Sequence, residues 1–263
     1  MHRYHIPIII LAVLAGILAV VLIFPVINII ITSDPGLLLA AIRDKEVFPS
    51  ITLTLECAGY ATLLALVFGV PLAYLLARFS FWGKSFIEAA INIPIIIPHA
   101  AAGIALLTVL SHGFVVGDIV KMTNVQIIDT KLGITIAMFF VSSPFLINNA
   151  IIAFNSFDAK LEKTARTLGA GFWRTFFAIS LPLSFRGIIK GALMMWGRGI
   201  SEFGAVVILA YHPMITSTLI FERFESYGLK HSKPVAALLI LLCLVFFSFI
   251  IYAGNSHARH KEY

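Results

Sequence analysis

The sequence contains few charged residues, and that scarcity decides its class. Only 12% of its 263 residues are charged, about half the share of roughly 25% that is usual in globular chains. By contrast, 60% belong to the apolar and aromatic class AVILMFWYC, which is more than a soluble fold has the interior to bury. We therefore exclude a soluble globular domain and predict an integral membrane protein surrounded by lipid.

Catalytic and metal-binding motifs are also missing. The sequence has no G-x-x-x-x-G-K-[ST] phosphate loop, no HExxH motif and no nucleophile elbow, so we expect that the chain is not an enzyme and does not itself hydrolyse ATP. Its two cysteines, Cys57 and Cys243, lie in apolar runs without ligand spacing, which predicts neither a metal site nor a disulfide. The net charge of +6 comes without a dense basic run, so no nucleic acid is expected as a partner.

Six apolar segments are long enough to cross a bilayer, which takes ~20 residues in a helix. The predicted spans are residues 6–31, 49–77, 85–110, 132–154, 187–210 and 234–253. The first is longer than the ~7–15-residue apolar region of a signal peptide, so we expect a retained anchor. The sequence thus predicts one all-α transmembrane domain over residues 1–263. Prolines inside the spans, such as Pro94 and Pro98, indicate either simple kinks or the shaping of a pathway.

Basic residues are unevenly divided between the two sets of loops. The set that includes both termini holds eleven Lys and Arg residues, against seven in the other. The positive-inside rule places the richer set in the cytoplasm, so a multi-pass protein of the cell membrane with both termini cytoplasmic is predicted. The eleven residues are Arg3, Arg78, Lys84, Lys160, Lys163, Arg166, Arg174, Arg186, Lys190, Arg259 and Lys261.

The longest predicted cytoplasmic loop, residues 155–186, contains an amphipathic pattern. Asp158 is suited to cap a short helix, and Leu161, Ala165 and Leu168 recur at four- and three-residue steps, which gives one apolar stripe. Gly169 stands where such a helix should end, since glycine accepts a left-handed backbone. From these residues alone, a helix lying on lipid and a helix docking a cytoplasmic partner are both open.

Ala165 to Ala170, followed by Ile179-Ser180-Leu181-Pro182, resemble the EAA loop of bacterial and archaeal ABC importer permeases. Lys163 and Thr164 replace the first two residues of that pattern, and Glu162 lies one position earlier. The resemblance implies a type I permease fold of six spans, in which this loop is a coupling helix that docks on an ATPase. The residues so assigned are Asp158, Leu161, Glu162, Ala165, Arg166, Thr167, Leu168, Gly169 and Ala170.

The same resemblance implies an assembly. A second copy of the chain would complete the membrane pathway, and two ATP-binding cassette subunits would carry ATP and Mg, with no cofactor on this chain. An extracytoplasmic binding protein would deliver the cargo.

A charged pair lies within the fifth predicted span. Arg198 and Glu202 are four residues apart and therefore share one helix face. A lone charge at midplane costs ~2.5 kcal/mol or more, so the pair should face protein or a wet cavity. Two interpretations stay open: a structural ion pair, or an element of a pathway together with Ser201 and Gly204. Gly187 and Gly191 form a GxxxG step suited to close helix packing, within the chain or across a dimer.

The segment from Gly197 to Val207 is similar to the molybdate, tungstate and sulfate branch of importer permeases, and Tyr211 to Met214 to its archaeal tungstate and molybdate members. The resemblance implies a tetrahedral oxyanion as cargo, with molybdate or tungstate ahead of sulfate. Three bases, Arg198, Lys121 and Arg223, are compatible with an anion.

The residues by themselves leave two other classes of membrane protein open. One is a secondary transporter driven by an ion gradient, for which acids such as Glu56 and Glu202 would serve. The other is a membrane scaffold without cargo. Co-purification of a phosphate-loop ATPase separates the importer from both.

Overall fold

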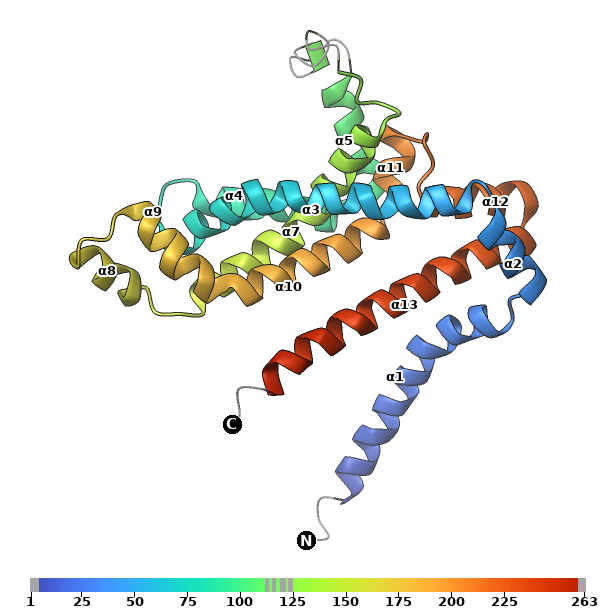
Figure 1. Ribbon diagram of the computed structural model, residues 1–263, viewed down its shortest axis with the longest axis horizontal. Helices are drawn as coiled ribbons and strands as arrows, with labels where there is room; N and C mark the ends of the chain where they lie inside the picture. The colour runs from blue at the N-terminus through green and yellow to red at the C-terminus, as the bar shows by residue number, and fades with distance from the viewer. Residues whose placement is uncertain (1–4, 112–113, 115–116, 119–121, 123–124, 260–263) are drawn as a thin grey trace. The chain divides into compact units, whose positions relative to one another are not determined.

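The computed structural model describes residues 5–259 except 112–113, 115–116, 119–121 and 123–124. Every regular secondary-structure element in the described residues is a helix (Figure 1). Contacts divide the chain into two compact units, Met1–Ile51 with Leu219–Tyr263, and Thr52–Thr218. The first unit joins the two ends of the chain, because its last helix packs on its first two.

The first unit contains the two ends of the chain. Helix α1 (His5–Ile31) carries an apolar span with none of its most apolar window buried, so lipid or another chain must cover it. Helix α2 (Pro35–Arg43) packs on α13 (Leu229–Arg259). Asp34 caps α2 by accepting from the Gly36 N–H at 2.7 Å, as expected for an N-cap carboxylate. Helix α12 (Thr216–Tyr227) leads into α13 through Gly228, whose φ is +70°.

The second unit is built around α7 (Lys131–Asn155), half of whose apolar window is buried. Helix α10 (Leu181–Ile200) packs along it. The contact is close because a Cβ added at Gly187 would lie 2.4 Å from Ala153 Cβ, and one at Gly191 would lie 2.8 Å from Asn149 Cβ. The GxxxG step therefore serves packing within this chain. The other helices of the unit are α3 (Val47–Arg78, which begins in the first unit), α4 (Lys84–Ile96), α5 (His99–Leu110), α8 (Lys160–Thr167), α9 (Phe172–Thr175) and α11 (Gly204–Leu209).

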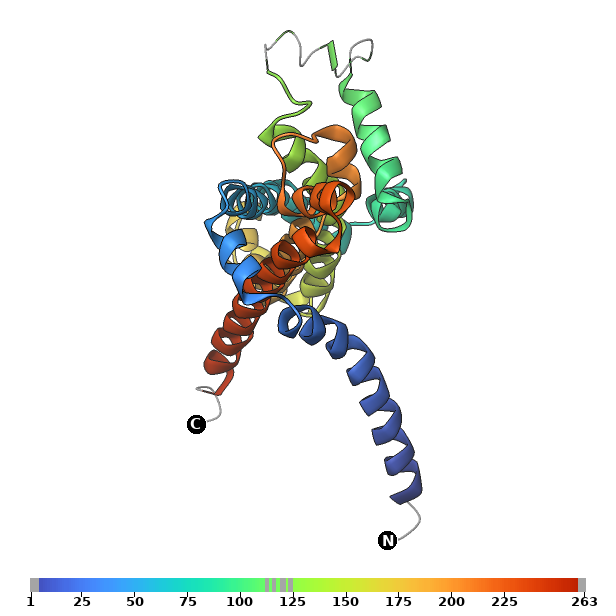
Figure 2. The same cartoon turned by 90° about the vertical axis from the view of Figure 1, so that its right-hand side faces the viewer.

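Among the described residues, five helices are long and apolar enough to cross a membrane, and a bent pair supplies a sixth crossing if it is one span. The third predicted span, residues 85–110, is that pair: α4 and α5 meet at 117°. The turn is visible in Figures 1 and 2, where α5 leaves the line of α4. Ile97 adopts an extended conformation before Pro98, as a residue preceding proline favours.

The fifth predicted span, residues 187–210, differs from the observed helices. One apolar helix runs over Phe172–Ile200, with a π-helical turn at Phe176–Ser180, and α11 is separate. The segment after Phe172 carries Arg174 and Arg186, which suggested a loop. Both side chains are exposed, and Arg174 lies near the start of the helix, where a basic side chain reaches the interface. The predicted loop 155–186 therefore shortens to residues 156–171 around α8.

Candidate functional site

Two helix breaks of the second unit meet at one place. Helix α10 ends at Ile200 and α11 begins at Gly204, while α5 begins at His99. A Cβ added at Gly204 would lie 2.7 Å from His99 Cβ, and one at Gly103 would lie 2.8 Å from the Ala205 carbonyl oxygen. Only glycine permits this approach of α5 and α11 without a shift of the backbone.

The charged side chains converge at this junction. Arg198 Nη2 donates to Glu202 Oε2 at 2.9 Å and lies 2.8 Å from His99 Nε2, and Arg198 Nη1 donates to Ser201 Oγ at 3.2 Å. Because a guanidinium only donates, the imidazole nitrogen that faces it is the acceptor. Glu202 Oε1 also accepts from the Ala205 N–H at 2.8 Å, which satisfies an otherwise free donor at the start of α11.

Burial differs across the cluster. The side chain of Glu202 is 1% exposed, that of Arg198 23% and that of His99 39%. The carboxylate of Glu202 is therefore enclosed, while the side chains of Arg198 and His99 reach accessible space.

The structure thus brings together the four residues that the sequence singled out here, Arg198, Ser201, Glu202 and Gly204. Sequence reasoning missed His99, which lies near none of them in sequence. The available signal was its position directly after Pro98, within an apolar run already interrupted by Pro94. A polar residue at a proline break in a span marks backbone that lines a cavity or is buried in protein.

Helix α8 forms the second candidate surface. Its Gly169 has φ +90°, and the Ala170 and Gly169 N–H groups donate to the Ala165 and Arg166 carbonyls at 3.0 Å, the two bonds of a Schellman cap. Asp158 Oδ1 accepts from the Lys160 N–H at 2.8 Å, so it supports the first turn.

The apolar stripe of α8 does not pack on this chain. Leu161 is 50% exposed and Leu168 is 84% exposed, while Ala165 is half-buried and Asp158, Arg166 and Thr167 are exposed. Two exposed leucines on a charged helix offer a contact to another molecule.

Glu162, unlike these leucines, packs against the rest of the chain. Its residue exposure is 4%. It accepts from Arg78 Nε at 3.0 Å and from Ser180 Oγ at 2.7 Å. It is therefore not part of the exposed face of α8.

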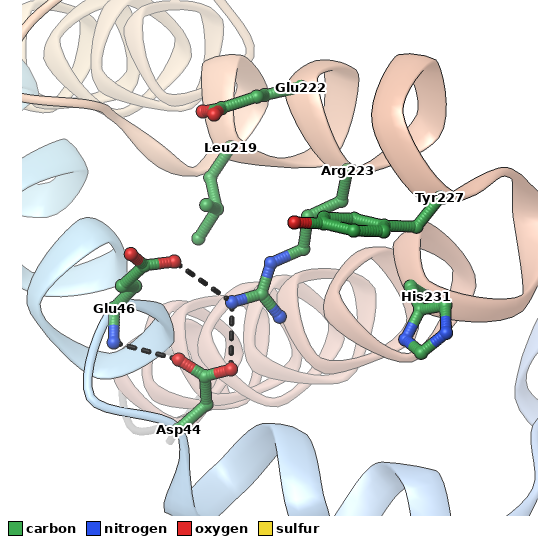
Figure 3. Close-up of a pocket in the computed structure, with 7 residues that line it drawn as sticks. All are labelled: Asp44, Glu46, Leu219, Glu222, Arg223, Tyr227 and His231. Carbon is green, nitrogen blue, oxygen red and sulfur yellow. Dashed lines mark hydrogen bonds and ion pairs between the residues drawn. The ribbon is translucent and has the colours of Figure 1, made fainter.

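A third feature is a polar cavity of about 370 Å³ in the first unit (Figure 3). Arg223 lies between two carboxylates there, at 2.7 Å from Asp44 Oδ2 and 3.2 Å from Glu46 Oε2. Burial raises the pKa of Asp44, but hydrogen bonds from the Glu46 N–H and from Arg223 outweigh it, so this pKa lies below its ordinary value of 3.8. Arg223 is thus engaged by carboxylates and is poorly placed to hold an anion. Lys121, the third base considered, lies outside the described residues.

Comparisons with known proteins agree with this architecture. A family model described as a binding-protein-dependent transport system inner membrane component matches residues 69–259. A molybdate/tungstate transport system permease protein of Thermococcus kodakarensis is 45% identical over 82% of this chain and 82% of its own length, and one of Methanocaldococcus jannaschii is 40% identical over 86% and 89%. A probable sulfate transport system permease protein of Chlorella vulgaris is 31% identical over 76% and 77%.

Solved structures share the fold. A bacterial ABC transporter that imports the acidic polysaccharide alginate contains a chain that superposes with a TM-score of 0.74, at 18% identity, covering 98% of this chain and 97% of that one. The same kind of transporter, in complex with an alginate pentasaccharide-bound periplasmic protein, gives a TM-score of 0.69 at 18% identity, covering 91% and 92%.

Proposed function

The chain belongs to the family of binding-protein-dependent transport system inner membrane components, and from that premise we propose that it is the permease subunit of an ATP-driven importer for a tetrahedral oxyanion. Molybdate or tungstate is the first choice of cargo and sulfate the next. The observation that carries the proposal is the 40–45% identity to molybdate/tungstate permeases over about four fifths of both chains. The family resemblance predicted from Ala165 to Pro182 is confirmed by the match.

The proposed complex contains two copies of this chain, two separate ATPase subunits that bind ATP and Mg, and an extracytoplasmic binding protein. The family description names dependence on a binding protein. The sequence has no phosphate loop, so in this proposal hydrolysis occurs on another chain. Both termini and α8 are proposed to be cytoplasmic, in accord with the excess of Lys and Arg in those segments.

We place the oxyanion pathway at the junction of Arg198, His99 and Glu202. Arg198 supplies a guanidinium whose planar donors suit a tetrahedral oxyanion. The carboxylate of Glu202, 2.9 Å away, competes for the same donors and lowers the affinity of Arg198 for an anion. A permease benefits from this balance, because conduction needs a site that admits the ion and then releases it.

Force would enter through α8. The exposed Leu161 and Leu168 are the apolar groups that would seat on the ATPase, and the Schellman cap at Gly169 sets the direction in which the chain leaves the helix. Closure of the ATPase around ATP would move the two α8 helices together and open the pathway outward.

Reconstitution tests the function. The chain, its partner ATPase and the binding protein are placed in proteoliposomes, and uptake of radiolabelled molybdate is followed with and without enclosed ATP. We expect that molybdate uptake requires both ATP and the binding protein. We also expect that excess tungstate inhibits it more strongly than excess sulfate does. Uptake driven by an ion gradient without ATP would instead indicate a secondary transporter, and no uptake under either condition would indicate a scaffold.

A further inference from the structure

Glu162 makes every polar contact that the described residues form between α8 and the bundle. Besides Arg78 Nε and Ser180 Oγ, its Oε2 accepts from the Tyr74 hydroxyl at 3.5 Å. Arg78 and Tyr74 belong to the end of α3, and Ser180 closes the π-helical turn just before α10. One carboxylate on α8 therefore binds both long helices.

The Arg78 guanidinium depends on this carboxylate. Its Nη2 is buried without a hydrogen-bond partner among the described residues, and its remaining support is the ring of Phe157, which lies 4.4 Å from the guanidinium carbon. Phe157 lies three residues before α8 begins at Lys160. Arg78 thus holds the segment before α8 through Phe157 and the helix itself through Glu162.

The π-helical turn brings Ser180 to Glu162. Residues 176–180 form the wider turn, and the Ser180 hydroxyl also lies 3.5 Å from the Thr175 carbonyl, five residues back. Phe176, in the same turn, meets the Tyr74 ring edge-to-face at 4.9 Å. Such turns are rare and are frequently found at functional sites, so the turn is explained if Ser180 must reach the carboxylate.

We propose that Glu162 is a positioning residue that fixes α8 to the ends of α3 and α10, so that a displacement of α8 moves both helices. This inference rests on the proposed function, in which an ATPase displaces α8. Packed side chains, hydrogen-bond networks and rigid helices carry coupling between distant sites. Without Glu162, α8 would keep its packing on α9 and on the π-helical turn and the contact of Arg166 with the Phe172 ring. It would have no hydrogen bond or ion pair to the bundle among the described residues, and the force would bend the loops that flank it.

Distance measurements in the full chain test the rigid connection without reference to transport. Spin labels at Lys163→Cys on α8 and Phe68→Cys on α3, both exposed sites, are introduced with Cys57→Ala and Cys243→Ala, and labelled chains are diluted with unlabelled ones in nanodiscs. Glu162→Gln should broaden the distribution of label–label distances about twofold, since it leaves Arg78 charged and unpaired. Glu88→Gln is the matched control, because Glu88 pairs with Lys84 at the surface, where its side chain is 41% exposed.

The reconstituted importer tests whether this connection transmits force. With Glu162→Gln, the ATPase should still co-purify and hydrolyse ATP, while the ATP consumed per oxyanion imported should rise roughly tenfold. The double variant Arg78→Met/Glu162→Met, which replaces the charges by apolar groups, should recover a narrow distribution and part of the coupling. An unchanged distance distribution, an unchanged ATP-to-oxyanion ratio, or loss of the ATPase from the complex would each overturn the proposal. A wild-type complex that imports no oxyanion would refute the proposed function, and the distances would still decide the role of Glu162.

Discussion

Glu202 has lost its contact with solvent, so its charge must be balanced inside the protein. Arg198 at 2.9 Å and the Ala205 N–H at 2.8 Å provide that balance. Sequence spacing left open whether Arg198 and Glu202 form a structural pair or a pathway element. The geometry is compatible with both interpretations at once, because a buried carboxylate holds in place an arginine that is partly exposed.

Removing only one charge of this pair should be costly. Arg198→Gln leaves a buried carboxylate without its cation, and we expect a loss of about 3–5 kcal/mol in the free energy of unfolding. Arg198→Gln/Glu202→Gln should lose less than the single variant, because no charge is left alone. Unfolding in detergent measures both, with Arg186→Gln, an exposed arginine of α10, as the control. A double variant that is less stable than Arg198→Gln would show that the two charges do not compensate each other.

Asp44 should make stability depend on pH in the acidic range. Its folded-state pKa is depressed, so the stabilisation is fully present above the ordinary value of 3.8 and declines as the pH falls through the folded-state pKa. Asp44→Asn should therefore lower the melting temperature near neutral pH, and the difference from the wild-type protein should shrink as the pH drops below that value. Glu225→Gln, at an exposed position, serves as the control. A difference that stays constant into the acid range would contradict the ion pair with Arg223.

At the scale of elements, local chemistry predicted some boundaries and not others. The end of α8 at Gly169 followed from the sequence because glycine there permits a left-handed backbone, and φ is +90°. The start of the fifth crossing did not follow, because Arg174 and Arg186 look like loop residues although they lie on an exposed helix surface. The break after Arg198 was also hidden, since nothing in Ser201-Glu202-Phe203 excludes a helix. It depends on Glu202 bonding to the Ala205 N–H and Ser217 donating to the Glu202 carbonyl, contacts that exist only in the folded chain.

The contact of α10 with α7 should tolerate no side chain at Gly187. Gly187→Ala places a Cβ 2.4 Å from that of Ala153, so the helices must separate, at a cost of about 1–3 kcal/mol. Gly171→Ala is the matched control, because a Cβ there meets nothing within 4 Å and its φ is an ordinary −66°. Unfolding midpoints in detergent should fall for the first variant and stay unchanged for the second. Equal midpoints would mean that α10 and α7 are more loosely packed than the structure shows.

At the scale of the whole molecule, membership of the permease family and the helical class were predictable, since composition and the spacing from Ala165 to Pro182 carry them. The path of the chain through the bilayer depends on α4 and α5. Bent at 117°, they are either one broken span or a re-entrant loop by length and composition. The proposed topology requires the first, because only then do the basic segments before α4 and around α8 lie on one side.

Labelling of single cysteines separates these two paths. Between Trp82 and Leu168 the chain passes α4–α5 and then α7, so the two positions share a side if α4–α5 crosses the membrane and lie on opposite sides if it returns. We expect Trp82→Cys and Leu168→Cys, both strongly exposed, to react with a membrane-impermeant maleimide only in inverted vesicles, in a background of Cys57→Ala and Cys243→Ala. His212→Cys, also exposed and beyond the crossing Phe172–Ile200, should react only in right-side-out preparations. If positions 82 and 168 are labelled from opposite sides, α4–α5 is a re-entrant loop. If both are labelled from the outer side, α8 lies outside the cell and cannot contact a cytoplasmic ATPase.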